Sequence, residues 1–156
     1  MNTQQLERIV RQVCKNDCFI GVYPSNHLPP SAATPSYYVL IANTQACDER
    51  GEHWISICVD RRRGLGEYFD SYGLPPNSEF REYLRENCRT GWTYNDKQLQ
   101  SIVSDVCGHY CAYYCMMKCI QRCISGMNDM LTLFTSDTTF NDSLVRRFIS
   151  RRLYLQ

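Results

Sequence analysis

The sequence has no long apolar run and almost no net charge. Its longest uncharged apolar stretch, 106–117, is too short to cross a bilayer and contains a histidine. The chain has seventeen Lys and Arg residues and sixteen Asp and Glu residues. Its net charge of +1 excludes a positive field over the whole molecule that would attract nucleic acid. The first twelve residues carry charges and have no apolar signal core. We therefore expect a soluble, intracellular protein in a reducing compartment, with no membrane partner.

The sequence also lacks any CxxC pair, although ten of its 156 residues are cysteine. A reducing compartment favours free thiols. Five cysteines recur every four residues: Cys107, Cys111, Cys115, Cys119 and Cys123. Each step of four turns a helical position by about 40°, so the five drift around the helix and cannot form one tetrahedral site. We predict no metal and no cofactor, and treat these cysteines as small core residues; a redox role for Cys14 and Cys18 stays open.

The hydrophobic pattern predicts a single α+β domain over residues 1–156. We expect a mostly antiparallel central sheet flanked by helices, with a hairpin turn at 60–64. Helices are expected over 3–14, 78–88, 107–124 and 142–153, and extended segments over 18–23, 36–43, 54–60, 66–72 and 90–95. The helix at 107–124 is apolar nearly all round, which is typical of a central, buried helix.

Cys107 stands where a loop becomes this buried helix. The first turn of a helix offers unpaired backbone N–H groups and the positive end of the helix dipole, which stabilise a thiolate and can bind an oxyanion. Position alone leaves both a nucleophile and a small core residue open for Cys107. Gln100, seven residues earlier, carries an amide that can donate to an oxyanion, and from position alone it is equally a solvated loop residue.

Only three histidines are available as a base for this thiol. His27 lies in a proline-rich loop, and His109 points about 200° away from Cys107 on a helix. His53 begins a strand, directly before Trp54, where its side chain can face a helix N-terminus across a cleft. We expect His53 to be the base, although a histidine at a strand edge is also an ordinary surface residue.

A base of this kind needs an acid that orients it. A hairpin turn at 60–64 places position 53 opposite position 70 when the two strands are paired around it. Asp70 is therefore expected beside His53. Asp60 is nearer in sequence but lies at the turn end of the hairpin, away from His53.

The order and spacing of these residues resemble those of the adenovirus-type cysteine protease (adenain) clan, which includes the SUMO-specific proteases. The matching segments are His53-Trp54, Phe69-Asp70-Ser71-Tyr72-Gly73, Gln100, Cys107-Gly108 and the early Phe19-Ile20-Gly21-Val22-Tyr23. The His-to-acid interval of 17 is the family's, and the Gln-to-Cys interval of seven is that of adenain. The short chain is similar to the compact proteases of Maverick/Polinton elements and adenovirus-like viruses. The acid is aspartate, as in the SUMO proteases, where adenovirus has glutamate.

The resemblance implies a papain-like arrangement and a role for each matched residue. Cys107 attacks the scissile carbonyl, His53 carries the proton and Asp70 fixes the imidazole tautomer. Gln100 and the backbone N–H of Cys107 form the oxyanion hole, and Trp54 forms a wall of the substrate cleft. In this family the substrate glycine enters a narrow tunnel, so cleavage at Gly-containing sites is expected.

Three functions follow as hypotheses. The leading one is a cysteine endopeptidase that matures precursor proteins of a virus or virus-like element, in the host nucleus and the virion. The second is a deconjugating protease for a ubiquitin-like or SUMO-type modifier. A hypothesis of another class is a non-catalytic, Cys-rich binding module.

Two further partners are raised by the resemblance, because adenain uses a peptide cofactor and DNA. No residue here identifies a site for an activating peptide. Four arginines lie on the last predicted helix: Arg146, Arg147, Arg151 and Arg152. They indicate either a solvated face or a weak nucleic acid contact.

Overall fold

The computed structural model describes residues 1–15, 17–45, 53–121 and 127–153. Within these ranges the helices are α1 (Thr3–Val13), η1 (Ser25–His27), η2 (Ser31–Ala33), α2 (Ser78–Asn87), α3 (Cys107–Gln121), α4 (Met127–Leu131) and α5 (Thr138–Leu153). The strands are β1 (Phe19–Pro24), β2 (Tyr37–Asn43), β3 (Trp54–Asp60), β4 (Leu65–Phe69) and β5 (Gly91–Tyr94). The predicted α+β class is confirmed.

The described strands form one five-stranded sheet in the order β1-β2-β3-β4-β5. Its centre is antiparallel, because β3 pairs antiparallel with both β2 and β4. Its two outer pairs, β1 with β2 and β4 with β5, are parallel, so the sheet is mixed. A connection of a dozen or more residues can return a chain in the same direction. The loop that carries η1 and η2 does this between β1 and β2, and α2 does it between β4 and β5.

The register of the β3–β4 hairpin differs from the prediction by two positions. Its last pair is Asp60 with Leu65, so the connection is four residues long, and Ser56 pairs with Phe69. Continued past Phe69, this register places position 70 opposite 55 and not opposite His53. A shift of two keeps both residues on the same face, because side chains alternate with a period of two.

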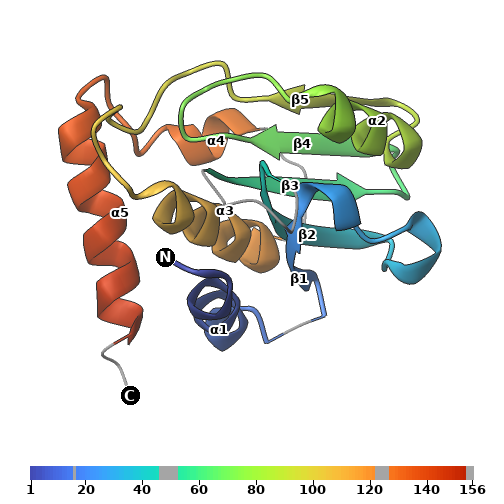
Figure 1. Cartoon of the computed structure of the whole chain (residues 1–156), viewed down its shortest axis with the longest axis horizontal. Coiled ribbons are helices and arrows are strands. Elements are labelled where there is room, and N and C mark those ends of the chain that lie inside the picture. The colour runs from blue at the N-terminus through green and yellow to red at the C-terminus, as the bar shows by residue number, and fades with distance from the viewer. Residues whose placement is uncertain (16, 46–52, 122–126, 154–156) are drawn as a thin grey trace.

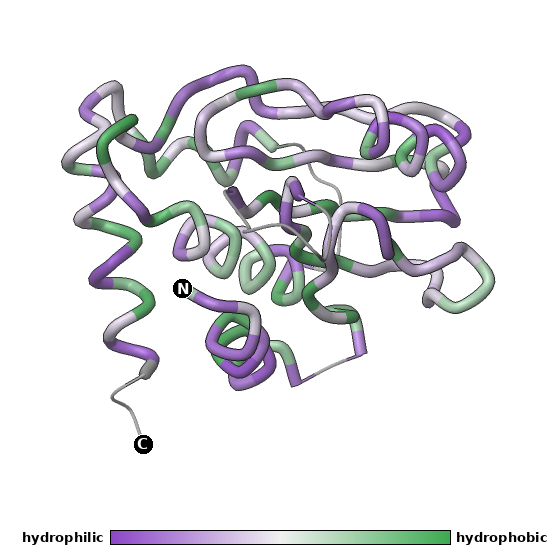
Figure 2. Tube along the Cα trace, in the orientation of Figure 1, coloured by the Kyte–Doolittle hydropathy of each residue, from purple (hydrophilic) through white to green (hydrophobic). Residues whose placement is uncertain are grey.

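Helices cover both faces of the sheet (Figure 1). One face packs against α3, which also contacts α1 and α5. The other face packs against α2 through Phe80, Tyr83 and Leu84. Hydrophobic and hydrophilic residues alternate along α1 and α5, as Figure 2 shows, whereas α3 is buried over most of its length, as predicted. No helix in the described part of the chain is long and apolar enough to cross a membrane.

A charged pair lies in the core between β4 and α3. Lys118 Nζ is 2.7 Å from Glu67 Oε2, and both side chains are completely buried. The Tyr114 hydroxyl donates a hydrogen bond of 2.7 Å to the same carboxylate oxygen, and the Lys118 ammonium lies 5.7 Å from the centre of the Tyr114 ring. The lysine contact lacks hydrogen-bond geometry, so it is an ion pair held by charge in a medium of low dielectric constant.

Candidate active site

Four predicted site residues come from four separate segments of the chain. His53 directly precedes β3, and Asp70 directly follows β4. Cys107 is the first residue of α3, and Gln100 lies in the loop that leads to it. The structure brings His53, Asp70 and Cys107 into contact at one end of the sheet.

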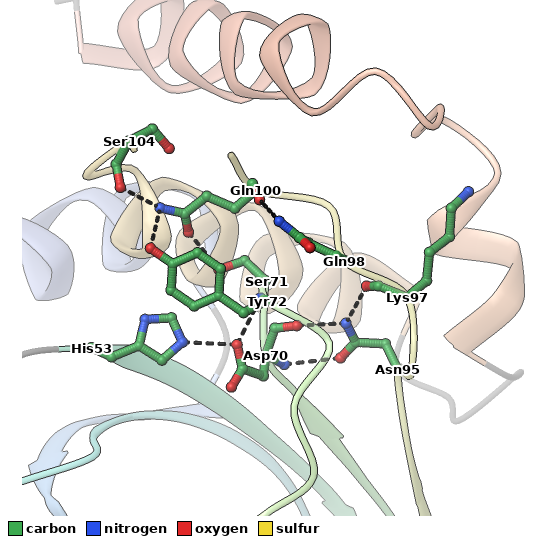
Figure 3. A network of polar contacts seen from close by, with 9 residues as sticks. All are labelled: His53, Asp70, Ser71, Tyr72, Asn95, Lys97, Gln98, Gln100 and Ser104. Atoms are coloured by element: carbon green, nitrogen blue, oxygen red, sulfur yellow. Dashed lines mark hydrogen bonds and ion pairs between the residues drawn. The ribbon is translucent and has the colours of Figure 1, made fainter. Parts of the chain in front are cut away.

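His53 and Asp70 form a short, largely buried contact (Figure 3). The Nε2 atom of His53 lies 2.8 Å from Oδ1 of Asp70, and the same oxygen accepts a 2.8 Å hydrogen bond from the backbone N–H of Tyr72. The Asn95 side chain holds the backbone of Asp70 from the other side. Asn95 accepts from the Asp70 N–H at 2.9 Å and donates to the Asp70 carbonyl at 2.5 Å. These bonds fix where the carboxylate stands.

The turn after Asp70 requires glycine at position 73. Gly73 has a φ of +73°, and its N–H donates to the Asp70 carbonyl at 2.8 Å. A Cβ atom at this position would lie 2.7 Å from the carbonyl carbon of Lys97. The turn is therefore packed tightly against the segment that continues to Gln100.

The Cys107 thiol is hydrogen-bonded to His53 and to backbone N–H groups of Trp54 and Gly108. Burial opposes the thiolate, but these bonds and the positive charge of His53 outweigh it, and the pKa of Cys107 lies below its ordinary value. Burial likewise opposes the imidazolium, yet the bonds to Asp70 and Cys107 raise the pKa of His53 to about 9. Because Nε2 faces Asp70, Nδ1 is the nitrogen left for the thiol. The pair therefore favours thiolate and imidazolium.

Gln100 is fully buried, which excludes the alternative of a solvated loop residue. Its Oε1 accepts a 2.7 Å hydrogen bond from the Ser71 hydroxyl. Its Nε2 donates to the Ser104 carbonyl at 2.9 Å and to the Tyr72 hydroxyl at 3.3 Å (Figure 3). Turning the amide over would set its oxygen against the Ser104 carbonyl, so the orientation of the amide is fixed.

Trp54 lies over the first turn of α3. Its indole N–H donates to the Met1 carbonyl at 3.1 Å. A Cβ atom at Gly108 would lie 3.4 Å from the indole and 3.2 Å from the Leu6 side chain, so glycine lets α1 and Trp54 approach the start of α3 closely. Trp54 is thus beside Cys107, and its role as a wall of a substrate cleft stays a prediction.

Tyr72 and Asn95 are site residues to which the sequence argument assigned no role. Tyr72 stacks on His53, with ring centroids 4.8 Å apart and planes inclined by 30°. It sits two positions after Asp70, inside the segment already singled out, so its proximity was a usable signal. Asn95 reaches Asp70 across a loop and has no such signal.

The other two histidines lie apart from this network, among the residues that the structure describes. His27 is exposed and its ring contacts Asn26. His109 is half-buried, and burial, the N-terminal amine and Arg146 lower its pKa to about 4. His109 is therefore neutral near pH 7.

Three cysteines meet in the core far along α3 from Cys107. The Cys119 thiol is hydrogen-bonded to Cys14 and Cys18. All three are buried. Cys47 and Cys123 lie outside the described residues. Among the residues that are described, no cluster of His, Cys, Asp or Glu could hold a metal ion. The redox role considered for Cys14 and Cys18 stays a prediction.

Comparison with known proteins found matches among solved structures only. No family model matches the chain, and neither does any curated protein. The crystal structure of the ASFV pS273R protease matches with a TM-score of 0.62 and 16% identity, over 92% of this chain and 65% of that chain. A selenomethionine structure of the same protease matches with a TM-score of 0.52 and 19% identity, over 70% of this chain and 43% of that chain. ChlaDub1 from Chlamydia trachomatis matches with a TM-score of 0.55 and 12% identity, over 78% of this chain and 62% of that chain.

The chain has the fold of the adenain/Ulp1-like cysteine proteases. The resemblance inferred from the order of His53, Asp70, Gln100 and Cys107 is thereby confirmed at the level of the fold. At such identities the likeness extends to the fold alone. The chain spans less than two-thirds of each of these solved chains.

Proposed function

We propose that this protein is a cysteine endopeptidase with Cys107 as nucleophile, His53 as base and Asp70 as orienting acid. One observation carries the proposal: a single imidazole is bonded to the Asp70 carboxylate through Nε2 and to the Cys107 thiol at the start of a buried helix. This is the nucleophile–base–orienter geometry that acyl transfer needs. The protease fold supports the same assignment.

The mechanism uses the ion pair that the site favours. The Cys107 thiolate attacks the scissile carbonyl carbon, and the carbonyl electrons move to the oxygen. Gln100 Nε2 and the Cys107 backbone N–H stabilise that oxyanion, each such donor contributing about 3–4 kcal/mol in related acyl transfer. The His53 imidazolium protonates the leaving amine, which departs. His53, now neutral, takes a proton from a water molecule whose oxygen adds to the thioester carbon; the C–S bond then breaks, the acid product leaves, and the Cys107 thiolate and His53 imidazolium are restored.

The proposed substrate is a precursor protein of a virus or virus-like element, cleaved at Gly-containing sites. This choice rests on the resemblance of the motif order and on the match to a viral protease fold. Removal of a ubiquitin-like modifier is the second candidate, and it uses the same chemistry on a different protein. A non-catalytic Cys-rich module is disfavoured, because it leaves the paired His53 and Asp70 and the buried Gln100 without a purpose.

The test is cleavage of a peptide library by the purified protein. Products of Gly-containing peptides are identified by mass spectrometry, and a modifier fused to a reporter through its C-terminal glycine is assayed in parallel. Cys107→Ser is expected to abolish cleavage, whereas Cys88→Ser, on the opposite face of the sheet, is the matched control. Stoichiometric zinc in a protein that cleaves neither substrate would instead favour the binding module.

A nucleic acid contact is proposed for the outer face of α5. A groove of about 690 Å³ there is lined by Phe140, Ser143, Leu144, Arg147, Phe148, Arg151 and Arg152. Arg146 points elsewhere and pairs with Asp105 at 2.9 Å, and Arg152 lies over the Phe148 ring at 4.5 Å. Arg147 and Arg151 are thus the arginines best placed to meet phosphates. An activating peptide stays a prediction, and we assign none of the described residues to it.

A further inference from the structure

Tyr72 touches three members of the site at once. Its backbone N–H donates to Asp70 Oδ1 at 2.8 Å, the oxygen that also holds His53. Its ring stacks on the His53 imidazole at 4.8 Å. Its hydroxyl accepts a hydrogen bond from Gln100 Nε2 at 3.3 Å. Figure 3 shows the phenol ring standing between the imidazole and the Gln100 amide.

The stack restrains the one motion that the Asp70 contact leaves to the imidazole. A single bond between Nε2 and the carboxylate fixes one atom of the ring but lets the plane rock about it. The stacked phenol ring, with its centroid 4.8 Å from that of the imidazole and its plane inclined by 30°, resists that rocking, because tilting the imidazole brings its edge against the phenol. The Nδ1 atom is thereby kept on the line to the Cys107 thiol.

The hydroxyl contact has a different character. At 3.3 Å it is longer than the 2.9 Å bond that the same nitrogen makes to the Ser104 carbonyl. A neutral phenol oxygen is a weaker acceptor than a developing oxyanion, since bonds to ionised acceptors are shorter and about twice as strong. Burial, together with the nearby charge of Cys107, raises the pKa of Tyr72, so the phenol stays neutral at the pH of the reaction.

We propose that Tyr72 is a positioning residue that links the base to the oxyanion hole. Its ring holds the His53 imidazole in line with the thiol, and its hydroxyl holds the second N–H of Gln100 in a fixed direction until the oxyanion takes over as acceptor. This role rests on the proposed function, because it acts through His53 and Gln100. Tyr72 itself exchanges no proton in the proposed mechanism and forms no bond to the substrate.

The two arms of the proposal are separated by Tyr72→Phe and Tyr72→Leu. Tyr72→Phe keeps the stack and removes only the oxygen, and we expect kcat to fall about 5- to 10-fold with KM unchanged, the size of one neutral hydrogen bond. Tyr72→Phe placed on Gln100→Ala should cause no further loss, since the hydroxyl then has no amide to hold. Tyr94→Phe, on β5, is the matched control and should leave kcat unchanged.

The proposed role of the Tyr72 ring can be tested without a substrate. The rate of Cys107 alkylation by iodoacetamide is measured against pH for each variant. Tyr72→Phe should keep the wild-type profile, and Tyr72→Leu should shift its midpoint upward by loosening the imidazole that stabilises the thiolate. Melting curves identify any variant that fails to fold, and Tyr72→Trp then replaces Tyr72→Leu as the test of stacking, with the wild-type profile expected.

The outcomes separate this inference from the proposed function. If the wild-type protein cleaves peptides, and the losses of Tyr72→Phe and Gln100→Ala multiply in the double variant, Tyr72 does not act through Gln100. If both Tyr72 variants match the wild type in kcat and in alkylation profile, the inference is overturned while the protease stands. If the wild type cleaves nothing but Tyr72→Leu still shifts the alkylation profile, the proposed function fails and the ring arm stands.

Discussion

His53 and Asp70 are diagonal neighbours across the β3–β4 hairpin, and yet their Nε2 and Oδ1 atoms meet at 2.8 Å. Asp70 directly follows Phe69, the last residue of β4 that pairs with β3, whereas His53 lies three positions before that residue's partner, Ser56. The contact therefore depends on the turn at 70–73 and on Asn95 as much as on strand pairing.

Replacing the acid should damage catalysis without damaging the fold. In Asp70→Asn the amide keeps the shape of the carboxylate but favours the wrong imidazole tautomer and does not stabilise the imidazolium. We expect kcat to fall by about 10³- to 10⁴-fold, as in other triads. Peptide hydrolysis under saturating substrate measures it. The control is Asp60→Asn, at the turn end of the hairpin, where equal loss would contradict the assignment.

The pH dependence of activity should follow the thiol–imidazole pair. The pKa of Cys107 is lowered and that of His53 is raised to about 9. Below the Cys107 pKa the nucleophile is protonated, and above about 9 the imidazolium that protonates the leaving amine is lost. A bell-shaped profile of kcat/KM is therefore expected, with its alkaline limb near pH 9. In His53→Ala the alkylation midpoint of Cys107 should move upward, and an unchanged midpoint would show that the two groups are not coupled.

Cys107 should be the first cysteine to react with iodoacetamide. Its thiol is partly exposed and its pKa is lowered, whereas burial raises the pKa of Cys58, Cys111 and Cys115 and hides them from reagent. Peptide mapping after brief labelling, with residual activity measured on the same samples, checks both the site and its consequence. Loss of activity with Cys107 still unmodified would place the nucleophile elsewhere.

Removing one charge of the Glu67–Lys118 ion pair should strongly destabilise the fold. Glu67→Gln leaves a buried ammonium without its counter-charge, and we expect the free energy of unfolding to fall by about 3–5 kcal/mol. Urea denaturation measures it. The double variant Glu67→Leu with Lys118→Met removes both charges and should recover most of that loss. A double variant as unstable as Glu67→Gln would mean that the charges themselves stabilise the core.

Binding to duplex DNA should be weak, with a shallow dependence on salt. The slope of log affinity against log salt follows the number of phosphates neutralised, and three arginines line the α5 groove, of which Arg152 lies over the Phe148 ring and leaves Arg147 and Arg151 to meet phosphates. Arg147→Ala with Arg151→Ala should remove most of the binding, and Arg81→Ala with Arg85→Ala, on α2, is the control. Peptide cleavage with and without DNA accompanies the titration. Strong DNA-dependent activation that disappears at high salt would contradict this expectation.

Chemistry-bearing positions were predictable where local geometry decides them. The apolar pattern of 107–124 predicted Cys107 at the start of a buried helix, and the hairpin turn at 60–64 predicted Asp70 beside His53. The exact pairing was wrong by two positions, because alternation defines a face but only the length of the turn defines the register. Because the register differed by an even number of positions, His53 and Asp70 stayed on the same face of the sheet and could still meet.

What escaped prediction depends on contacts between distant segments. Asn95 meets Asp70 from 25 residues away, and Lys118 meets Glu67 from the last turn of an apolar helix. No periodic pattern in the sequence predicts either contact. The last helix was expected from 142 but begins at Thr138, because the Asp137 side chain accepts the Phe140 N–H at 2.9 Å and stabilises the earlier start.

Asp70, Ser71 and Tyr72 are consecutive, and all three contact the site. Asp70 binds Nε2 of His53, and Ser71 binds Oε1 of Gln100. The Tyr72 phenol contacts both His53 and Gln100. Gly73 then closes the segment against Lys97. A substitution within this tripeptide changes one contact, whereas an inserted or deleted residue displaces every contact downstream of it by a full residue spacing. At 70–73 the length of the segment that carries the acid is therefore as tightly constrained as its chemistry.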